Sequence, residues 1–189
     1  YAVEEDVQTV GSRFMGKYAV AAIVADKVVD ALASASASLD SVTLTMIMSA
    51  YLSCRQPADA IRTFEAAVGF RADGSADAIV KTIEGKNGGR IVPDESALNI
   101  YAVAAVLQAH AVTGEIASVS RVLACLEGRS GVSVYGVESA PWPWTGEYGS
   151  IQPDTLCYNI AIAAATKLGG RQGVNTALEL FDQMRDGAK

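Results

Sequence analysis

The chain has 189 residues, of which half are apolar and 19% are charged, and its formal net charge is −6. This composition excludes a disordered acidic chain and gives no general attraction for phosphate backbones. The length allows one domain or a short run of repeats, and an aromatic content of 7% favours closely packed helices over a β-sandwich.

The three cysteines, Cys54, Cys125 and Cys157, lie far apart and are odd in number. This pattern predicts packed, reduced thiols in a reducing compartment instead of a disulfide framework. His110 has no companions at zinc-ligand spacing, so no metal site is predicted and the histidine is expected to be packed or on the surface. No apolar run reaches the length of a membrane span. The chain begins at Tyr1, which suggests a processed or excised piece without a visible targeting segment.

In chain order, the first strong helical pattern covers residues 17–38. A second helix is expected after Asp40, whose carboxylate is a good N-cap. Pro57 interrupts that pattern and suits the first turn of a further helix, so the two form a hairpin of about thirty residues. The apolar positions at helical spacing in the hairpin are Val42, Leu44, Met46, Ile47 and Tyr51, then Ala60, Ile61, Phe64 and Val68.

The hairpin pattern recurs twice. A short helix around residues 76–84 and a Gly-rich loop precede Pro93-Asp94, where a long helix is expected to run to Gly114 before a second helix begins. An irregular stretch of about 128–152 follows, and Pro153-Asp154 opens the third hairpin. The positions expected inward in the middle hairpin are Leu98, Tyr101, Ala105 and Leu107, then Ile116, Val119, Val122 and Leu123.

A helix pair that recurs with its own start signal predicts a solenoid, because each pair can bury its apolar stripe only on its neighbours. We therefore expect a single all-α segment over residues 1–189, an α-solenoid of helix-turn-helix repeats with long insertions. Its expected divisions are a degenerate repeat (6–40), a repeat (41–70), an insertion (71–92), a repeat (93–127), an insertion (128–152) and a repeat (153–189).

These hairpins resemble pentatricopeptide repeats (PPR), a family of 35-residue helix hairpins found mostly in mitochondria and plastids. Tetratricopeptide repeats have a similar shape, but their Trp, Gly and Tyr set in the first helix is missing here. The middle unit departs from the family in a first helix about five residues too long, and the last unit has three extra residues in its turn. The matching residues are Asp40, Val42, Thr43, Thr45, Ala60, Ile61 and Phe64; Pro93, Asp94, Asn99 and Gly114; and Pro153, Asp154, Tyr158, Asn159, Ala177, Leu178, Leu180, Phe181 and Met184.

The resemblance implies binding of single-stranded RNA at about one base per repeat, read by two side chains of each unit. Carried over to this chain, the reading pairs are Thr45 with Asp94 and Asn99 with Asp154, which resemble guanine- and uracil-reading pairs. Asn159 would have its partner beyond residue 189. The same residue types are good helix caps, so capping alone remains an alternative for them.

Two further groups of residues are candidate contacts. Lys81, Lys86 and Arg90 are a candidate phosphate-binding patch, although a solvated loop is the competing interpretation. A loop with two proline-spaced tryptophans is typical of partner contacts, and packing on the solenoid itself is the alternative. The residues of that loop are Trp142, Trp144 and Tyr148.

Two functions are therefore expected. The resemblance implies an organellar RNA-binding protein acting in transcript processing, stability or translation, in a mitochondrion or a plastid. The acidic charge, the long insertions and the tryptophan loop favour a scaffold subunit of a large organellar complex, such as a ribosome. The sequence has no paired carboxylates, no Cys-His and no Ser-His arrangement in a sensible context, so neither an enzyme nor a cofactor is expected.

Overall fold

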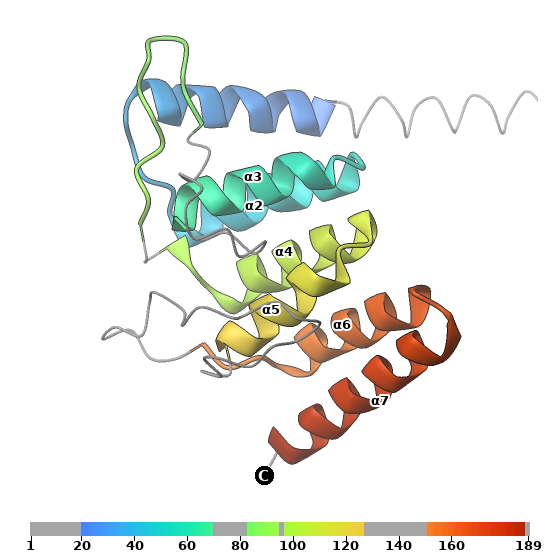
Figure 1. The fold of residues 1–189 in the computed structure, drawn as a ribbon. Helices are drawn as coiled ribbons and strands as arrows, with labels where there is room; N and C mark the ends of the chain where they lie inside the picture. Colours follow the sequence, from blue (N-terminus) through green and yellow to red (C-terminus); the bar gives the residue numbers. More distant parts are fainter. Residues whose placement is uncertain (1–19, 70–82, 95–96, 127–150, 188–189) are drawn as a thin grey trace, which may run out of the picture.

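The structure, a computed structural model, describes residues 20–69, 83–94, 97–126 and 151–187. These residues form seven packed helices and no sheet, which confirms the all-α prediction (Figure 1). The first helix covers residues 20–34 of the described part. The other helices are α2 (Ser41–Ser53), α3 (Pro57–Val68), α4 (Ile100–Thr113), α5 (Ile116–Leu126), α6 (Thr155–Lys167) and α7 (Gly170–Gly187).

Consecutive helices pack in pairs, α2 with α3, α4 with α5 and α6 with α7. The first helices of these pairs also touch one another, α2 with α4 and α4 with α6. In addition α3 contacts α4 and α5 contacts α6, so each second helix reaches the first helix of the next pair. The helices consequently lie in layers, with the helix of residues 20–34 at one end and α7 at the other (Figure 1).

Each first helix of a pair begins at a polar residue that caps it. Asp40 accepts hydrogen bonds from Val42 N at 2.9 Å and Thr43 N at 2.8 Å. At α4 the same place is taken by Asn99, whose Oδ1 accepts from Ala102 N at 2.7 Å. At α6 the Asp154 carboxylate accepts from the third residue of the helix. Such caps satisfy amide groups that have no partner inside the helix.

The turn that ends each first helix lies fifteen positions after its cap. Arg55, Gly114 and Gly169 all have left-handed backbone, with φ of 57°, 81° and 67°. Counted from Asp40, Asn99 and Asp154, the three hairpins are therefore in one register. Two of the three turn residues are glycines, which adopt this conformation without steric cost.

The start of α4 differs from the prediction. A long helix was expected from Pro93-Asp94, yet α4 begins only at Ile100, and Asp94 lies in the connection, where its backbone N donates to Ala67 O at 2.8 Å. The helix is therefore 14 residues long, close to the 13 of α2 and α6, and has no extra residues. Asn99 is the N-cap of α4 because its side-chain oxygen accepts a hydrogen bond from a backbone N–H that has no partner within the helix.

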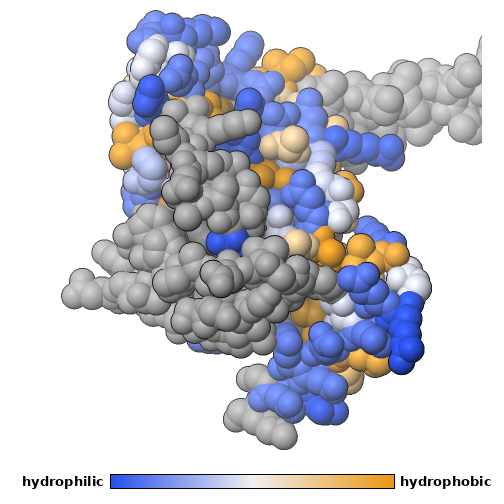
Figure 2. Space-filling model, in the orientation of Figure 1, coloured by the Kyte–Doolittle hydropathy of each residue, from blue (hydrophilic) through white to orange (hydrophobic). Residues whose placement is uncertain are grey.

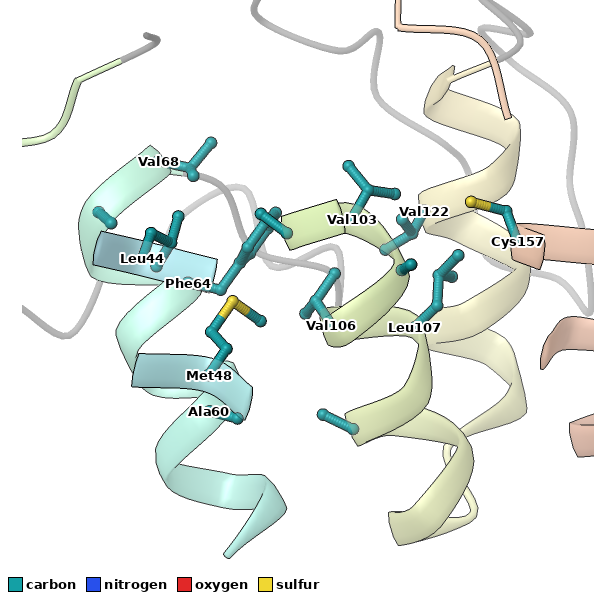
Figure 3. Close-up of a cluster of buried hydrophobic side chains, with 14 of the residues drawn as sticks. Leu44, Met48, Ala60, Phe64, Val68, Val103, Val106, Leu107, Val122 and Cys157 are labelled. Carbon is teal, nitrogen blue, oxygen red and sulfur yellow. The ribbon is translucent and has the colours of Figure 1, made fainter. Parts of the chain in front are cut away.

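The core runs continuously through the layers. Phe64 of α3 and Met48 of α2 meet the valines of α4, and Leu107 with Val122 continues the cluster toward Cys157 (Figure 3). Leu44, Ile47 and Tyr51 are buried, and Val119, Val122 and Leu123 of α5 are buried as predicted. These apolar contacts supply the main stabilisation of the stack.

Four apolar residues of the predicted helices are exposed, and Tyr101 among them was expected to face inward. Val42 is 65% exposed, and Met46 and Tyr101 are both 68% exposed. Phe181 of α7 is also exposed, because α7 is the last described helix of the stack. The helical period was right in these segments, but α2 and α4 are apolar around most of their circumference, so the period alone could not select the buried side.

The described part of the expected insertion 71–92 packs on the first helix. Lys86 Nζ forms a salt bridge of 3.0 Å with Asp30, and Val92 N donates to Ala37 O at 3.1 Å. Gly85 passes so close to Ser34 that an added Cβ would lie 2.3 Å from Ser34 N. Residues 83 and 84, the described end of the short helix expected at 76–84, are not helical.

A candidate ligand-binding face on the first helices

The common register aligns one stripe of each first helix on the outside of the stack. The stripe takes the second, sixth, ninth and thirteenth residues of each helix, a spacing that keeps side chains on one side. Because α4 touches both α2 and α6, the three stripes lie next to one another. We call this surface the first-helix face, after the first helix of each pair; it does not include the helix of residues 20–34. Its residues are Val42, Met46, Ser49 and Ser53 of α2; Tyr101, Ala105, Gln108 and Val112 of α4; and Leu156, Ile160, Ala163 and Lys167 of α6.

The first-helix face is apolar and almost without charge. Its twelve positions include one charged side chain, Lys167, at the end of α6. Apart from Ala105 and Ile160, which are half-buried, all of these residues are exposed. The outer side of a surface helix is normally polar, whereas contiguous exposed apolar residues mark interaction sites. Figure 2, in the orientation of Figure 1, shows apolar patches among the polar residues on the side of the molecule that faces the viewer.

At the edge of this face, the side chains of Thr45 and Asn99 share one hydrogen-bond acceptor, while Asp94, the predicted partner of Thr45, lies in the connection before α4. Thr45 Oγ1 donates to Ser41 O at 2.7 Å, and Asn99 Nδ2 donates to the same oxygen at 3.3 Å. The structure thus joins the fifth residue of α2 to the cap of the following first helix. Within the fold Thr45 thus uses its one hydroxyl donor, and Asn99 uses one amide donor and its carbonyl oxygen.

Asn99 is therefore not equivalent to Thr45 and Asn159, as the sequence motif had suggested. The fifth residue of α4 is Ala104, which is buried and has no polar side chain. Asn159 is exposed at the fifth position of α6, and Asp154 caps that helix through Cys157 N at 2.9 Å. The capping alternative thus describes the observed contacts of Asp154 and Asn99.

The described members of the predicted phosphate patch are engaged in salt bridges. Lys86 pairs with Asp30, and Arg90 Nη2 lies 2.9 Å from Glu84 Oε1. Both belong to the segment that packs on the first helix, away from α4 and α6 (Figure 1). Lys81 and the predicted partner-contact residues Trp142, Trp144 and Tyr148 lie outside the described residues.

His110 is packed, as expected. Its ring is buried, and Nδ1 lies 2.8 Å from Glu115 Oε2 at the turn between α4 and α5. Among the described residues no group of His, Cys, Asp and Glu could hold a metal ion. The same part of the chain has no helix that is both long and apolar enough to cross a bilayer.

The sequence contains a signal for this register, but the Pro-Asp motif led to a different predicted start for the helix of the middle hairpin. A polar cap followed fifteen positions later by a turn residue occurs at Asn99–Gly114 and at Asp154–Gly169. Counting back from the turn glycine, and not forward from Pro93, would have placed Tyr101 on the exposed stripe. Compared with known protein families, curated proteins and solved structures, the chain matches none of them.

Proposed function

We propose that this chain is an α-solenoid of PPR-type repeats that works, without catalysis, as a scaffold subunit of an organellar assembly. The common register of the three hairpins supports the solenoid, since α3 contacts α4 as α5 contacts α6. The organelle follows from the resemblance of the repeats. The first-helix face is the surface that binds a protein partner.

The nearly uncharged surface of the first-helix face is the observation that carries this proposal. The centres of protein interfaces are depleted of charge and enriched in aromatic residues and methionine. Tyr101 and Met46 are residues of these kinds on the first-helix face. RNA would instead need cations to neutralise phosphates, and Lys167 is the one cation among the twelve positions of the face. The net charge of −6 opposes RNA further.

Single-stranded RNA is the second candidate ligand, and two observations favour it. Thr45 and Asn99 converge on Ser41 O, which places two polar side chains of successive units together, as in a base-reading pair. Tyr101 and Leu156 are exposed at matching positions and could stack on bases. Ala104 interrupts this series at α4, because it offers no polar group.

A pair of valine substitutions tests the scaffold function. Val42→Asp introduces a charge on the first-helix face, and an acidic residue in the first turn of α2 is compatible with the helix. Val92→Asp introduces the same charge at an exposed valine outside this face. Each variant is used to retrieve complexes from an organelle extract, with and without ribonuclease.

We expect retention that resists ribonuclease, is lost in Val42→Asp and persists in Val92→Asp. Equal retention of complexes by both variants would show that the first-helix face does not bind the partner. Two results together would instead support the RNA-binding function: ribonuclease abolishes the retention, and the chain binds short single strands in a salt-dependent way that Asn159→Ala weakens.

A further inference from the structure

The last described helix, α7, exposes a phenylalanine whose counterpart on α3 is buried. Residues 60–67 of α3 (AIRTFEAA) and 177–184 of α7 (ALELFDQM) share an Ala, an aliphatic residue, a Phe and an acidic residue at matching places. Thr63 and Leu180, which match, are both buried. Phe64, however, is 1% exposed, whereas its counterpart Phe181 is 49% exposed.

The difference between the two phenylalanines comes from α4. Phe64 lies among the valines of α4, where Val103 and Val106 are fully buried (Figure 3). At α7 the residues that match Pro57, Ile61 and Phe64 form the stripe Val174, Leu178 and Phe181; all three are exposed, whereas Pro57 and Ile61 are half-buried and Phe64 is buried. The stripe is therefore shaped to receive a helix that carries aliphatic side chains in the manner of α4.

The chain has a helix of this kind at its other end. Residues 18–24 read YAVAAIV and residues 101–107 read YAVAAVL, so the first helix repeats the segment with which α4 covers α3. Val20 and Ile23 correspond to Val103 and Val106, but they are 58% and 54% exposed. The first helix buries a different stripe, Ala22, Ala25, Val29 and Ala33.

We propose that copies of this chain associate head to tail, with α7 of one copy packed against the first helix of the next. The contact would repeat the α3–α4 junction, because both halves of that junction recur, uncovered, on one chain. Figure 1 places the two helices at opposite ends of the stack, so one copy cannot close the contact on itself. Such a heterologous contact can add further copies in the same direction.

Both surfaces have apolar centres and margins of mixed charge. On the first helix Lys27 lies one turn after Ile23 and is exposed, next to the exposed Asp26. On α7 Asp182 follows Phe181 directly, and its carboxylate lies 3.1 Å from Arg185 Nη2 of the same helix. The apolar centres, and not the charges, therefore carry this contact. Figure 2 shows apolar atoms on the outer surface at the N-terminal end of the first helix.

The test uses the full chain with one charge at each end. Phe181→Asp blocks the α7 stripe, and Val24→Asp blocks the first helix; both side chains are exposed, so the fold should persist. Mass is measured by sedimentation over a wide range of protein concentration, and circular dichroism verifies the helices. The parent chain, of 19.7 kDa, should gain mass as its concentration rises.

Each single variant should remain a monomer at every concentration. An equimolar mixture of the two should form dimers and stop there, because each variant retains one free surface and the two surfaces are complementary. A parent chain that stays monomeric would overturn the proposal. Dimers of Val24→Asp alone would also overturn it, since they would require a symmetric α7–α7 contact. None of these results depends on the ligand of the first-helix face.

Discussion

Thr45 Oγ1 and Asn99 Nδ2 both donate a hydrogen bond to the carbonyl oxygen of Ser41, at 2.7 and 3.3 Å. The shared acceptor connects the first turn of α2 with the start of α4, 58 residues further along the chain. Asn99 also holds the α4 N-terminus through Oδ1 and Ala102 N. One amide therefore fixes both the boundary of a helix and the position of that helix beside its predecessor.

Substitution of Asn99 should separate these two roles. Asn99→Ala removes the cap and the bond to Ser41, so the free energy of unfolding should fall by about 1–2 kcal/mol. Asn99→Asp retains the accepting oxygen but loses the donor, so its loss should be smaller. Chemical denaturation of both variants measures the difference. Equal stability of Asn99→Ala and the parent chain would contradict the observed start of α4.

The register of α4 predicts opposite outcomes for two of its apolar residues. Leu107 is fully buried in the layer between α3 and α6, so Leu107→Ala should lower the free energy of unfolding by about 2–5 kcal/mol. Tyr101 lies on the exposed stripe, and Tyr101→Ala should change it by less than about 0.5 kcal/mol. Thermal denaturation followed by circular dichroism compares the two. A large loss for Tyr101→Ala would restore the inward orientation that the sequence suggested.

How far the sequence predicts this fold depends on the kind of signal. Local signals were sufficient for the helices: Asp40 and Asp154 cap α2 and α6 as expected, and Pro57 opens α3. The buried side was less predictable where a helix is apolar all round. Val42 and Leu44 are both aliphatic residues of α2, yet Leu44 is buried and Val42 is exposed. That information belongs to packing between layers and not to the period of one helix.

The candidate site was harder to predict than the fold for a related reason. A Pro-Asp pair opens the third hairpin, so the same pair at Pro93-Asp94 suggested the same start. In the structure Asp94 instead lies in the connection, and its backbone bonds to the end of α3. The motif and the cap are the same residue at Asp154 but five residues apart at Asp94 and Asn99. A single short motif cannot distinguish these two cases.

Tyr51 should couple the first helix to the rest of the stack. Its hydroxyl donates to Asp26 Oδ1 at 2.7 Å, and its ring is buried. Tyr51→Phe keeps the ring but leaves Asp26 without this donor, so the free energy of unfolding should fall by about 1 kcal/mol. Hydrogen exchange should show the loss mainly in residues 20–34. Uniform exchange changes across α4 and α6 would argue against a local role.

The same tyrosine should make stability depend on alkaline pH. Burial, followed by the hydrogen bond to Asp26, raises the pKa of Tyr51 well above its ordinary value of 10. The folded state therefore holds the proton more tightly, so the contribution is complete below pH 10 and is lost as pH rises toward the folded pKa. Denaturation midpoints measured across this range should fall less steeply in Tyr51→Phe. Parallel pH profiles for the two proteins would contradict this assignment.

Cys157 should react with thiol reagents only when the α4–α6 contact opens. Its side chain is fully buried, and burial raises the pKa of the thiol to about 12, so the thiolate is scarce near neutral pH. Cys54 is partly exposed at the end of α2 and should be modified first. A Cys125→Ser background leaves these two thiols as the reporters, and denaturant should release the slower one. Modification of both thiols at the same rate in the folded protein would mean that α6 does not cover Cys157 against α4, because a thiol in that core needs local unfolding before a reagent can reach it.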